Sequence, residues 1–381
     1  MNARATPSAD TWLLLRGLTR ETGHWGDLPD RLAAALPGAR VIALDLPGNG
    51  VLHGEPSPAS VEAMVEALRA QWAGLATLIA GAEAGTMPDL AAAPRAAGTT
   101  GHDPAGLPEL HGSPDARPAA APRVNLLAMS LGAMVAVAWA AAHPAEIGRA
   151  VLVNTSLRPF SPPWQRLRPR NWLRLPGLLR PWLSASEVEE GVLRLTSARV
   201  HVRAAAGNPS ELPAAYAPDA DPAANYLPPW TAAERRLIVG CWVELRARHP
   251  VTGANALRQL GAAMRYRAPA EAPPVPLLLL AGGRDALVSP QCSRRLAAVW
   301  GLPLREHARA GHDLPLDAPD WVVAQVAAFA AGAAASGPAS APGSAVSAPG
   351  PTARAAASPA DDARPAGQSP VPGPAGFRHR A

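Results

Sequence analysis

The chain has 381 residues, and 35 basic residues against 30 acidic ones give it a formal net charge of +5. Every basic residue counted there is arginine, and the arginines are interleaved with acidic residues, so no basic stripe indicates a nucleic-acid partner. The two cysteines, Cys241 and Cys292, are too few for a disulfide framework or a zinc site, which predicts a reducing compartment. No motif indicates a cofactor or a metal.

Two segments rich in proline and alanine lack the apolar side chains needed to offset the entropy of ordering them. Residues 81–122 are predicted to be a low-complexity insert, and residues 331–381 a disordered tail. The rest of the chain is long enough for one large domain that contains an inserted lid.

Apolar runs and helical spacings alternate along the first part of the chain. Gly17 ends the first apolar run, and a turn cluster over residues 47–50 ends the second. Ser57 as cap and Pro58 in the first position predict the start of a long helix. The expected elements are strands over residues 12–16, 41–46, 124–129 and 150–154, and helices over 28–36, over 57–80 and from Leu131.

The uncharged run Val124–Ala142 has about the length that spans a bilayer. Ser130 and Gly132 interrupt it between a β-type part and an alanine-rich part, which favours a strand, a sharp turn and a buried helix. The apolar run over residues 12–15 is too short for a signal-peptide core. We therefore expect no membrane span and a cytoplasmic protein.

The alternation stops over residues 157–274, which carry five tryptophans and indicate a helical lid, and then resumes. The chain is thus expected to contain a first core part (1–156), the lid (157–274), a second core part (275–330) and the tail. Strands that are apolar on both faces are typical of a mostly parallel, doubly wound α/β sheet. The later expected elements are strands over 275–281 and 303–307 and helices over 290–300 and 320–329.

Ser130 lies between an expected strand and an expected helix, in the string Ala128-Met129-Ser130-Leu131-Gly132. In a nucleophile elbow the strand and helix backbones nearly touch, so small residues are needed two positions before and after the serine. Ala128 and Gly132 meet that need. The turn would raise the serine hydroxyl above the carboxyl ends of the strands, where ligands bind in such sheets.

A serine nucleophile needs a base, and the base needs an orienting acid. Asp285 and His312 each follow an expected strand and therefore fall at the same sheet edge as Ser130. The sequence resembles the lidded α/β-hydrolases, whose triad runs in the order Ser, Asp, His. The resemblance implies that Ser130 is the nucleophile, Asp285 the acid and His312 the base.

Three further stretches carry this resemblance, one of which is Gly311-His312-Asp313, with Pro319 downstream, which matches the family's Gly-His loop before the last helix. Arg16-Gly17-Leu18 stands where the family has a His-Gly loop, which implies an oxyanion hole made by the backbone N–H groups of Leu18 and Leu131. Residues 45–50 match the family's Asp-x-Pro-Gly-x-Gly turn, in which Asp45 is expected to accept hydrogen bonds from backbone N–H groups. Ala128 in place of glycine and Arg16 in place of histidine depart from the family pattern.

The roles of several polar and aromatic residues stay open at this stage. Arg16 is either a buried ion-pair partner or a residue that reaches the substrate. Asn154 follows a strand at an edge where some relatives place the acid, but it is uncharged, so Asp285 is preferred. Trp164 and Trp172 either pack within the lid or line an acyl pocket.

Six arginines occur between Leu157 and Ser186, a stretch without an acidic residue: Arg158, Arg166, Arg168, Arg170, Arg174 and Arg180. They form either a solvated surface or a landing site for an acidic partner. The layout is similar to that of the pimeloyl-carrier-protein methyl ester esterases of biotin synthesis, whose lid arginines bind an acidic acyl-carrier protein.

The resemblance implies a serine hydrolase that cleaves a carboxylic ester or thioester of a small-molecule or acyl substrate through an acyl-enzyme. An acyltransferase that uses the same triad is an alternative, because only the acceptor of the acyl group differs. A non-catalytic ligand-binding or scaffold protein is the second alternative.

Overall fold

The computed structural model describes residues 10–83, 123–178, 180, 182–201 and 227–335. Most of the expected insert and tail lies outside these residues. The described strands form one six-stranded sheet in the order β2-β1-β3-β4-β5-β6, in which every neighbouring pair is parallel. This confirms the predicted parallel α/β sheet. The strands are β1 (Thr11–Leu15), β2 (Arg40–Leu44), β3 (Val124–Met129), β4 (Ile147–Val153), β5 (Leu277–Gly282) and β6 (Leu304–His307).

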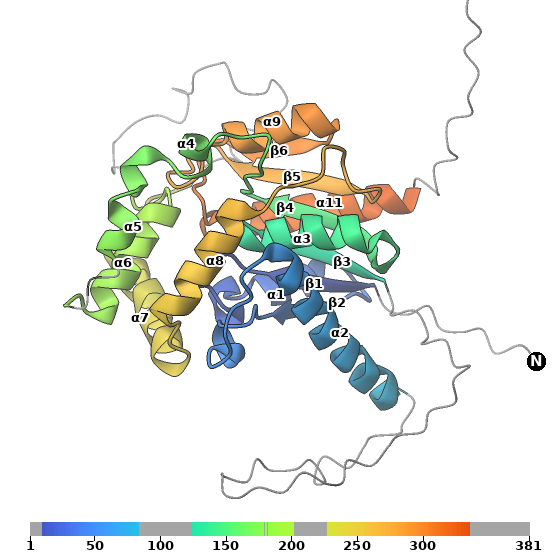
Figure 1. Ribbon diagram of the computed structural model, residues 1–381, viewed down its shortest axis with the longest axis horizontal. Helices are drawn as coiled ribbons and strands as arrows, with labels where there is room; N and C mark the ends of the chain where they lie inside the picture. Colours follow the sequence, from blue (N-terminus) through green and yellow to red (C-terminus); the bar gives the residue numbers. More distant parts are fainter. Residues whose placement is uncertain (1–9, 84–122, 179, 181, 202–226, 336–381) are drawn as a thin grey trace, which may run out of the picture. The chain divides into compact units, whose positions relative to one another are not determined.

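Helices cover both faces of the sheet (Figure 1). In β1, Leu13 and Leu15 pack with α2, α3 and α9, whereas Trp12 and Leu14 pack with α1 and α11. This alternation follows from the two-residue period of a strand, and burial on both sides explains the continuous apolar runs. The helices are α1 (Leu28–Ala35), α2 (Val61–Glu83), α3 (Leu131–Ala142), α9 (Gln291–Trp300), α10 (Leu314–Asp317) and α11 (Pro319–Ala335), with 3₁₀ turns η1 (Thr22–Trp25), η2 (Gly50–Leu52) and η4 (Pro144–Glu146).

Three of the predicted helix boundaries are wrong. Ser57 does not cap α2, because its hydroxyl donates to the carbonyl of Pro47 and its N–H donates to Asn255, so the helix begins only at Val61. At its other end α2 continues to Glu83, inside the expected insert. The last helix, α11, continues to Ala335, inside the expected tail, because its alanine-rich end has a high helix propensity.

The segment between β4 and β5 leaves the sheet and forms the lid. α6 and α7 pack around Leu193, Val239 and Trp242, so the lid has a small apolar cluster of its own. Trp164, Trp172 and Trp182 are instead exposed. The lid elements are α4 (Pro163–Arg166), η5 (Pro169–Asn171), α5 (Arg174–Gly177), α6 (Ala185–Thr196), α7 (Ala232–Arg248) and α8 (Gly253–Arg265).

The uncharged run Val124–Ala142 divides into β3 and α3, as predicted, with Ser130 at the turn between them. Its alanine-rich half is buried against the sheet. Among the helices of the described residues, none combines the length and the apolar character that crossing a bilayer requires.

Candidate active site

Ser130 occupies the sharp turn that the sequence predicted between β3 and α3. Its backbone has φ 55° and ψ −115°, a conformation that residues other than glycine rarely adopt. Its N–H donates to the carbonyl of Val153 at the end of β4, with an N···O distance of 2.9 Å. Backbone strain of this kind persists only where neighbouring structure fixes it, and it occurs often at active sites.

Two glycines allow the backbones around Ser130 to approach each other. A Cβ atom on Gly132 would lie 2.5 Å from the carbonyl oxygen of Leu15 and 2.6 Å from that of Arg16. A Cβ atom on Gly17 would lie 3.0 Å from Ser130 Cβ and 3.4 Å from its Oγ. The turn after β1 therefore lies directly against the serine.

Replacing Gly132 with alanine is expected to destabilise the protein by about 1–3 kcal/mol or more, because the new methyl group would overlap backbone atoms that cannot rotate away. The matched control is Gly74→Ala in α2, where nothing lies within 4 Å of the added Cβ. That change should be neutral or stabilising by up to about 1 kcal/mol. Denaturant unfolding of both variants checks this, and equal stabilities would contradict the close approach at Gly132.

Asp285 and His312 come together at the carboxyl edge of the sheet, on the loops after β5 and β6. His312 Nδ1 lies 2.7 Å from Asp285 Oδ2, and both side chains are almost fully buried. The other carboxylate oxygen, Oδ1, accepts hydrogen bonds from the N–H groups of Leu287 and Val288, each at 2.8 Å. The carboxylate is therefore held in place independently of the imidazole.

Asn154 follows β4 and links the end of this strand to the loop after β6 that carries His312, which we call the histidine loop. Its side-chain amide donates to the carbonyls of Gly311 (3.0 Å) and His312 (2.7 Å) and accepts from the N–H of Gly282 (2.8 Å). The hydrogen bonds of its side chain thus go to backbone groups. The acid beside His312 is Asp285, which the sequence favoured over Asn154.

We call residues 16–22, the turn that follows β1 and contains the predicted oxyanion donor Leu18, the oxyanion loop. Within the described part of the chain, neither the N–H of Leu18 nor that of Leu131 donates to another backbone group. Asp45 accepts hydrogen bonds from the N–H groups of Thr22 (2.8 Å) and Val51 (3.1 Å), which confirms its predicted role. Asp45 thus fixes the far end of the loop, while the N–H groups of Leu18 and Leu131 remain available to bind a ligand oxygen.

Arg16 forms a buried, bidentate ion pair with Asp313, the residue that follows His312. Its Nη2 and Nη1 lie 2.7 and 3.2 Å from the two carboxylate oxygens of Asp313. Its guanidinium also lies over the ring of Trp25, 4.8 Å from the centroid. Because the charge is engaged with Asp313 and the side chain is only 3% exposed, this geometry favours the structural role of Arg16 over contact with a substrate.

The lid is joined to the histidine loop through Asp317. The buried carboxylate of Asp317 accepts hydrogen bonds from Ser197 Oγ (2.5 Å) and the N–H groups of Ala198 (2.9 Å) and Gly311 (2.7 Å). Burial raises the pKa of Asp317 to about 6, while these hydrogen bonds act in the opposite direction. The end of α6 therefore packs on the loop that carries His312.

The lid is also joined to the oxyanion loop, through charged groups. Glu189 of α6 is buried and pairs with Arg20 at 2.8 Å and with Arg246 of α7 at 3.2 Å. His249 lies 2.7 Å from Glu21. Burial lowers the pKa of Arg20, and the adjacent Glu189 opposes that shift.

Two residues proposed for substrate contact lie at the surface of the lid. Trp164 is 58% exposed and Trp172 is 50% exposed, so both side chains largely face solvent. The Trp172 indole N–H donates to the carbonyl of Leu167 within the lid. Their role in an acyl pocket remains a prediction.

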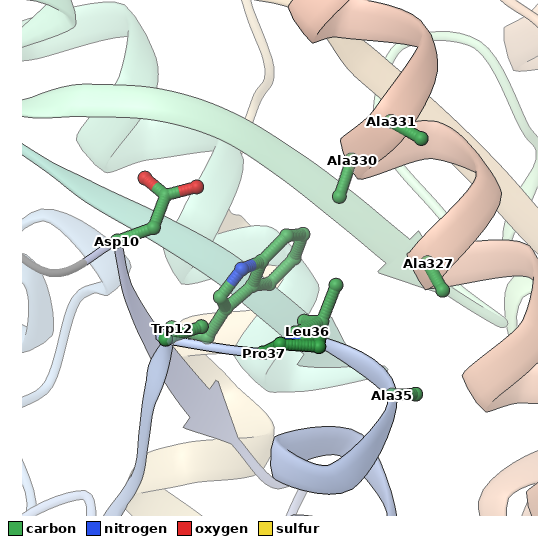
Figure 2. A pocket seen from close by; sticks show the side chains of 10 residues that line it. Asp10, Trp12, Ala35, Leu36, Pro37, Ala327, Ala330 and Ala331 are labelled. Atoms are coloured by element: carbon green, nitrogen blue, oxygen red, sulfur yellow. The ribbon is translucent and has the colours of Figure 1, made fainter.

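A separate hollow of about 570 Å³ lies at the opposite, amino-terminal edge of the sheet (Figure 2). It is bordered by Asp10 and Trp12 at the start of β1, by Leu36 after α1 and by Ala327 and Ala330 of α11. Because β1 and β3 are parallel, this hollow is far from the end of β3 that carries Ser130. In the described ranges, no group of three His, Cys, Asp or Glu side chains is arranged to hold a metal ion.

The roles of three residues that shape the site were not predicted from the sequence. Asp313 could have been suspected from its place beside His312 and the buried Arg16. Asn154 was weighed only as an acid, although its amide organises three backbone segments. Gln259 of α8 bonds to the oxyanion loop, and no local sequence pattern marks a residue whose partner is 240 positions away.

A parallel sheet with helices on both faces, a serine at the strand–helix turn and a buried Asp–His pair at the same edge define the architecture of the α/β-hydrolases. A model of the family described as serine aminopeptidase, S33, matches residues 115–314, which is more than half of the chain. The chain belongs to this family of α/β-hydrolases.

Solved structures with this fold have diverse activities. The enol-lactonase from Burkholderia xenovorans LB400 is 17% identical with a TM-score of 0.54, over 85% of this chain and 92% of that chain. A thermophilic esterase from Thermogutta terrifontis is 17% identical with a TM-score of 0.50, over 86% and 91%. A membrane phospholipase A described as a bacterial virulence factor is 18% identical with a TM-score of 0.52, over 87% and 81%. No curated protein matches the sequence.

Proposed function

We propose that this protein is a serine hydrolase that cleaves a carboxylic ester or thioester through an acyl-enzyme. Ser130 is the nucleophile, His312 the general base and Asp285 the acid that orients it. The observation that carries the proposal is the buried 2.7 Å contact between His312 Nδ1 and Asp285 Oδ2, on loops at the sheet edge where Ser130 lies. The solved enol-lactonase and esterase structures support this class of chemistry by their shared fold.

The contact between His312 Nδ1 and Asp285 supports the tautomer that such a reaction needs. Asp285 accepts the Nδ1–H of His312, which leaves Nε2 as the basic nitrogen for the Ser130 hydroxyl. Ser130 Oγ attacks the acyl carbon, its proton passes to Nε2, and this proton then leaves with the alcohol or thiol. A water molecule, activated by the same nitrogen, releases the acid. The amides of Leu18 and Leu131 would stabilise the oxyanion.

Ester cleavage fits the charges near the site better than removal of N-terminal amino acids, the activity in the family's name. An aminopeptidase needs an acidic group for the substrate ammonium. The buried acids at the oxyanion loop are already engaged with other groups. Glu189 pairs with Arg20 and Arg246, and Asp313 pairs with Arg16. Glu21 contacts His249, and Asp45 accepts backbone N–H groups of the loop and of η2. This favours an uncharged acyl group.

A panel of p-nitrophenyl esters of rising chain length tests the proposal, run with and without a serine-directed fluorophosphonate. Turnover that the fluorophosphonate abolishes supports a serine hydrolase, and the preferred chain length sizes the acyl pocket. An aminoacyl p-nitroanilide tests the peptidase activity, and added alcohols test acyl transfer. A protein that neither turns over an ester or anilide nor reacts with the fluorophosphonate is a scaffold.

The arginine-rich part of the lid supports a second element of the proposal, an acidic acyl-carrier protein as the source of the substrate. Arg174 and Arg180 are exposed there, and Arg180 lies 5.8 Å from the Trp182 ring centroid. Arg166 is less suited to such contact, because it is half-buried and donates to the carbonyl of Ala263. Arg170 donates to the carbonyl of Ala286 beside Asp285, so changing it would also disturb the acid.

Replacing Arg174 and Arg180 together with alanine is expected to raise KM for a carrier-borne ester about 3- to 10-fold, because exposed charges act on encounter and docking. The kcat/KM for a small soluble ester should not change. The matched control replaces Arg236 and Arg248, exposed arginines of α7. Added salt should mimic the double variant, since charges are screened beyond about 10 Å at 0.1 M ionic strength. If neither the double variant nor added salt changes the turnover of the carrier-borne ester, these arginines form a solvated surface.

A further inference from the structure

The oxyanion loop is held by a buried amide from the lid. Gln259 of α8 is fully buried, and its Oε1 accepts the N–H of Thr19, with an N···O distance of 2.8 Å. Thr19 follows Leu18, whose amide is one of the two proposed oxyanion donors. The side chain of Gln259 therefore binds the peptide unit between Leu18 and Thr19, which directly follows the one that carries the Leu18 N–H.

The orientation of this amide is fixed by its other partners. Nε2 of Gln259 donates to Asn49 Oδ1 (2.8 Å) and to Ser57 Oγ (2.9 Å). Nδ2 of Asn49 in turn donates to the carbonyl of Arg20 at 3.0 Å. Gln259 and Asn49 thus hold consecutive residues of the loop, one by its N–H and one by its C=O.

The loop needs such support because its backbone is strained. Thr19 has φ 56°, in the left-handed region that residues other than glycine and asparagine avoid. A strained residue relaxes when the bonds that hold it are removed. Relaxation at Thr19 would rotate the two peptide units that flank it. One of them, between Leu18 and Thr19, is joined through the Leu18 Cα to the peptide that presents the Leu18 N–H beside Ser130. Gly17 lies close to Ser130 Cβ, so even a small shift of this part of the loop would change its distance from the serine.

We propose that Gln259 is a positioning residue for the oxyanion hole, which aligns the Leu18 amide by holding Thr19 in its strained conformation. The proposal rests on the proposed function for its effect on the reaction rate. It also couples the lid to the chemistry, because α8 belongs to the segment inserted between β4 and β5.

The test compares Gln259→Met, which keeps the volume but removes the acceptor and the donors, with Asn255→Leu. Asn255 is also a buried amide on α8, one turn earlier, but its partners are Ser57 N and the carbonyl of Glu55, outside the oxyanion loop. Active sites are titrated with a fluorophosphonate so that kcat refers to folded enzyme. A transition-state analogue, a trifluoromethyl ketone with the acyl chain of the best ester, reports oxyanion binding separately.

For Gln259→Met we expect kcat per titrated site to fall about 10- to 100-fold with KM nearly unchanged, less than the full loss of one oxyanion donor. The affinity for the ketone should fall by a similar factor. For Asn255→Leu, kcat and the affinity for the ketone should stay within about twofold of wild type, even if this variant is destabilised as much as Gln259→Met. Asn49→Ala, which releases the carbonyl of Arg20, should resemble Gln259→Met and serves if that variant does not fold.

The proposal would be overturned if Gln259→Met kept the kcat and the ketone affinity of the wild type. It would also be overturned if Asn255→Leu lost as much kcat and ketone affinity as Gln259→Met. Amide hydrogen exchange of residues 16–22 provides a readout that does not need turnover. It should accelerate at Thr19 in Gln259→Met but not in Asn255→Leu. If the wild-type protein turns over no ester, the proposed function fails. The anchoring by Gln259 is refuted separately, by an exchange rate at Thr19 that does not change in Gln259→Met.

Discussion

Ser130→Ala is expected to reduce kcat for the best p-nitrophenyl ester by about 10³-fold or more, with the fold intact. In the proposed mechanism the hydroxyl is the attacking group, so its removal leaves only the oxyanion hole and substrate binding. The turn itself should survive, because it depends on the Ser130 N–H bond to Val153 and on Gly132 rather than on the hydroxyl. Unfolding curves and far-UV circular dichroism check the fold.

The control for this variant is Ser293→Ala, a buried serine in α9. It should retain wild-type kcat, because Asp285 is held by His312 and by the N–H groups of Leu287 and Val288, and not by Ser293. Loss of fluorophosphonate labelling should occur in Ser130→Ala alone. Ordinary turnover or labelling in Ser130→Ala would refute the assignment of the nucleophile.

Asp285→Asn is expected to lower kcat by about 10⁴-fold at neutral pH, the second large effect. In the proposed mechanism the carboxylate accepts the Nδ1–H of His312 and stabilises the imidazolium that forms when Ser130 loses its proton. An asparagine side chain can turn its NH₂ group toward Nδ1, which favours the wrong tautomer and leaves Nε2 protonated. His312→Ala should cost at least as much. The measurement is kcat per titrated active site.

Asn154→Ala is the informative comparison for the acid. Its side chain bonds only to the backbone of Gly282, Gly311 and His312, so its loss should lower stability and reduce kcat far less than Asp285→Asn does. The reverse ranking would mean that the loop after β4, and not the loop after β5, controls the imidazole.

Local sequence was sufficient for the elements whose pattern depends on neighbours along the chain. Buried parallel strands appear as short apolar runs, and the six strands lie within a few residues of their predicted positions. The elbow could also be predicted, because its sharp turn needs small residues at fixed offsets from Ser130, which Ala128 and Gly132 provide. The same reasoning failed at Ser57, where a good local cap is engaged by Pro47 and Asn255 instead.

By itself, then, the sequence determined the sheet, the turn at Ser130 and the order of Ser130, Asp285 and His312, since each rests on short-range stereochemistry and on the rule that parallel strands end at one edge. Only the tertiary structure decided that Asp285 contacts His312, that Arg16 pairs with Asp313, and that Gln259 holds Thr19. These pairs are separated by 27, 297 and 240 positions. A buried polar group must find a partner because leaving it unpaired is costly, but which partner it finds depends on how the chain brings distant loops together.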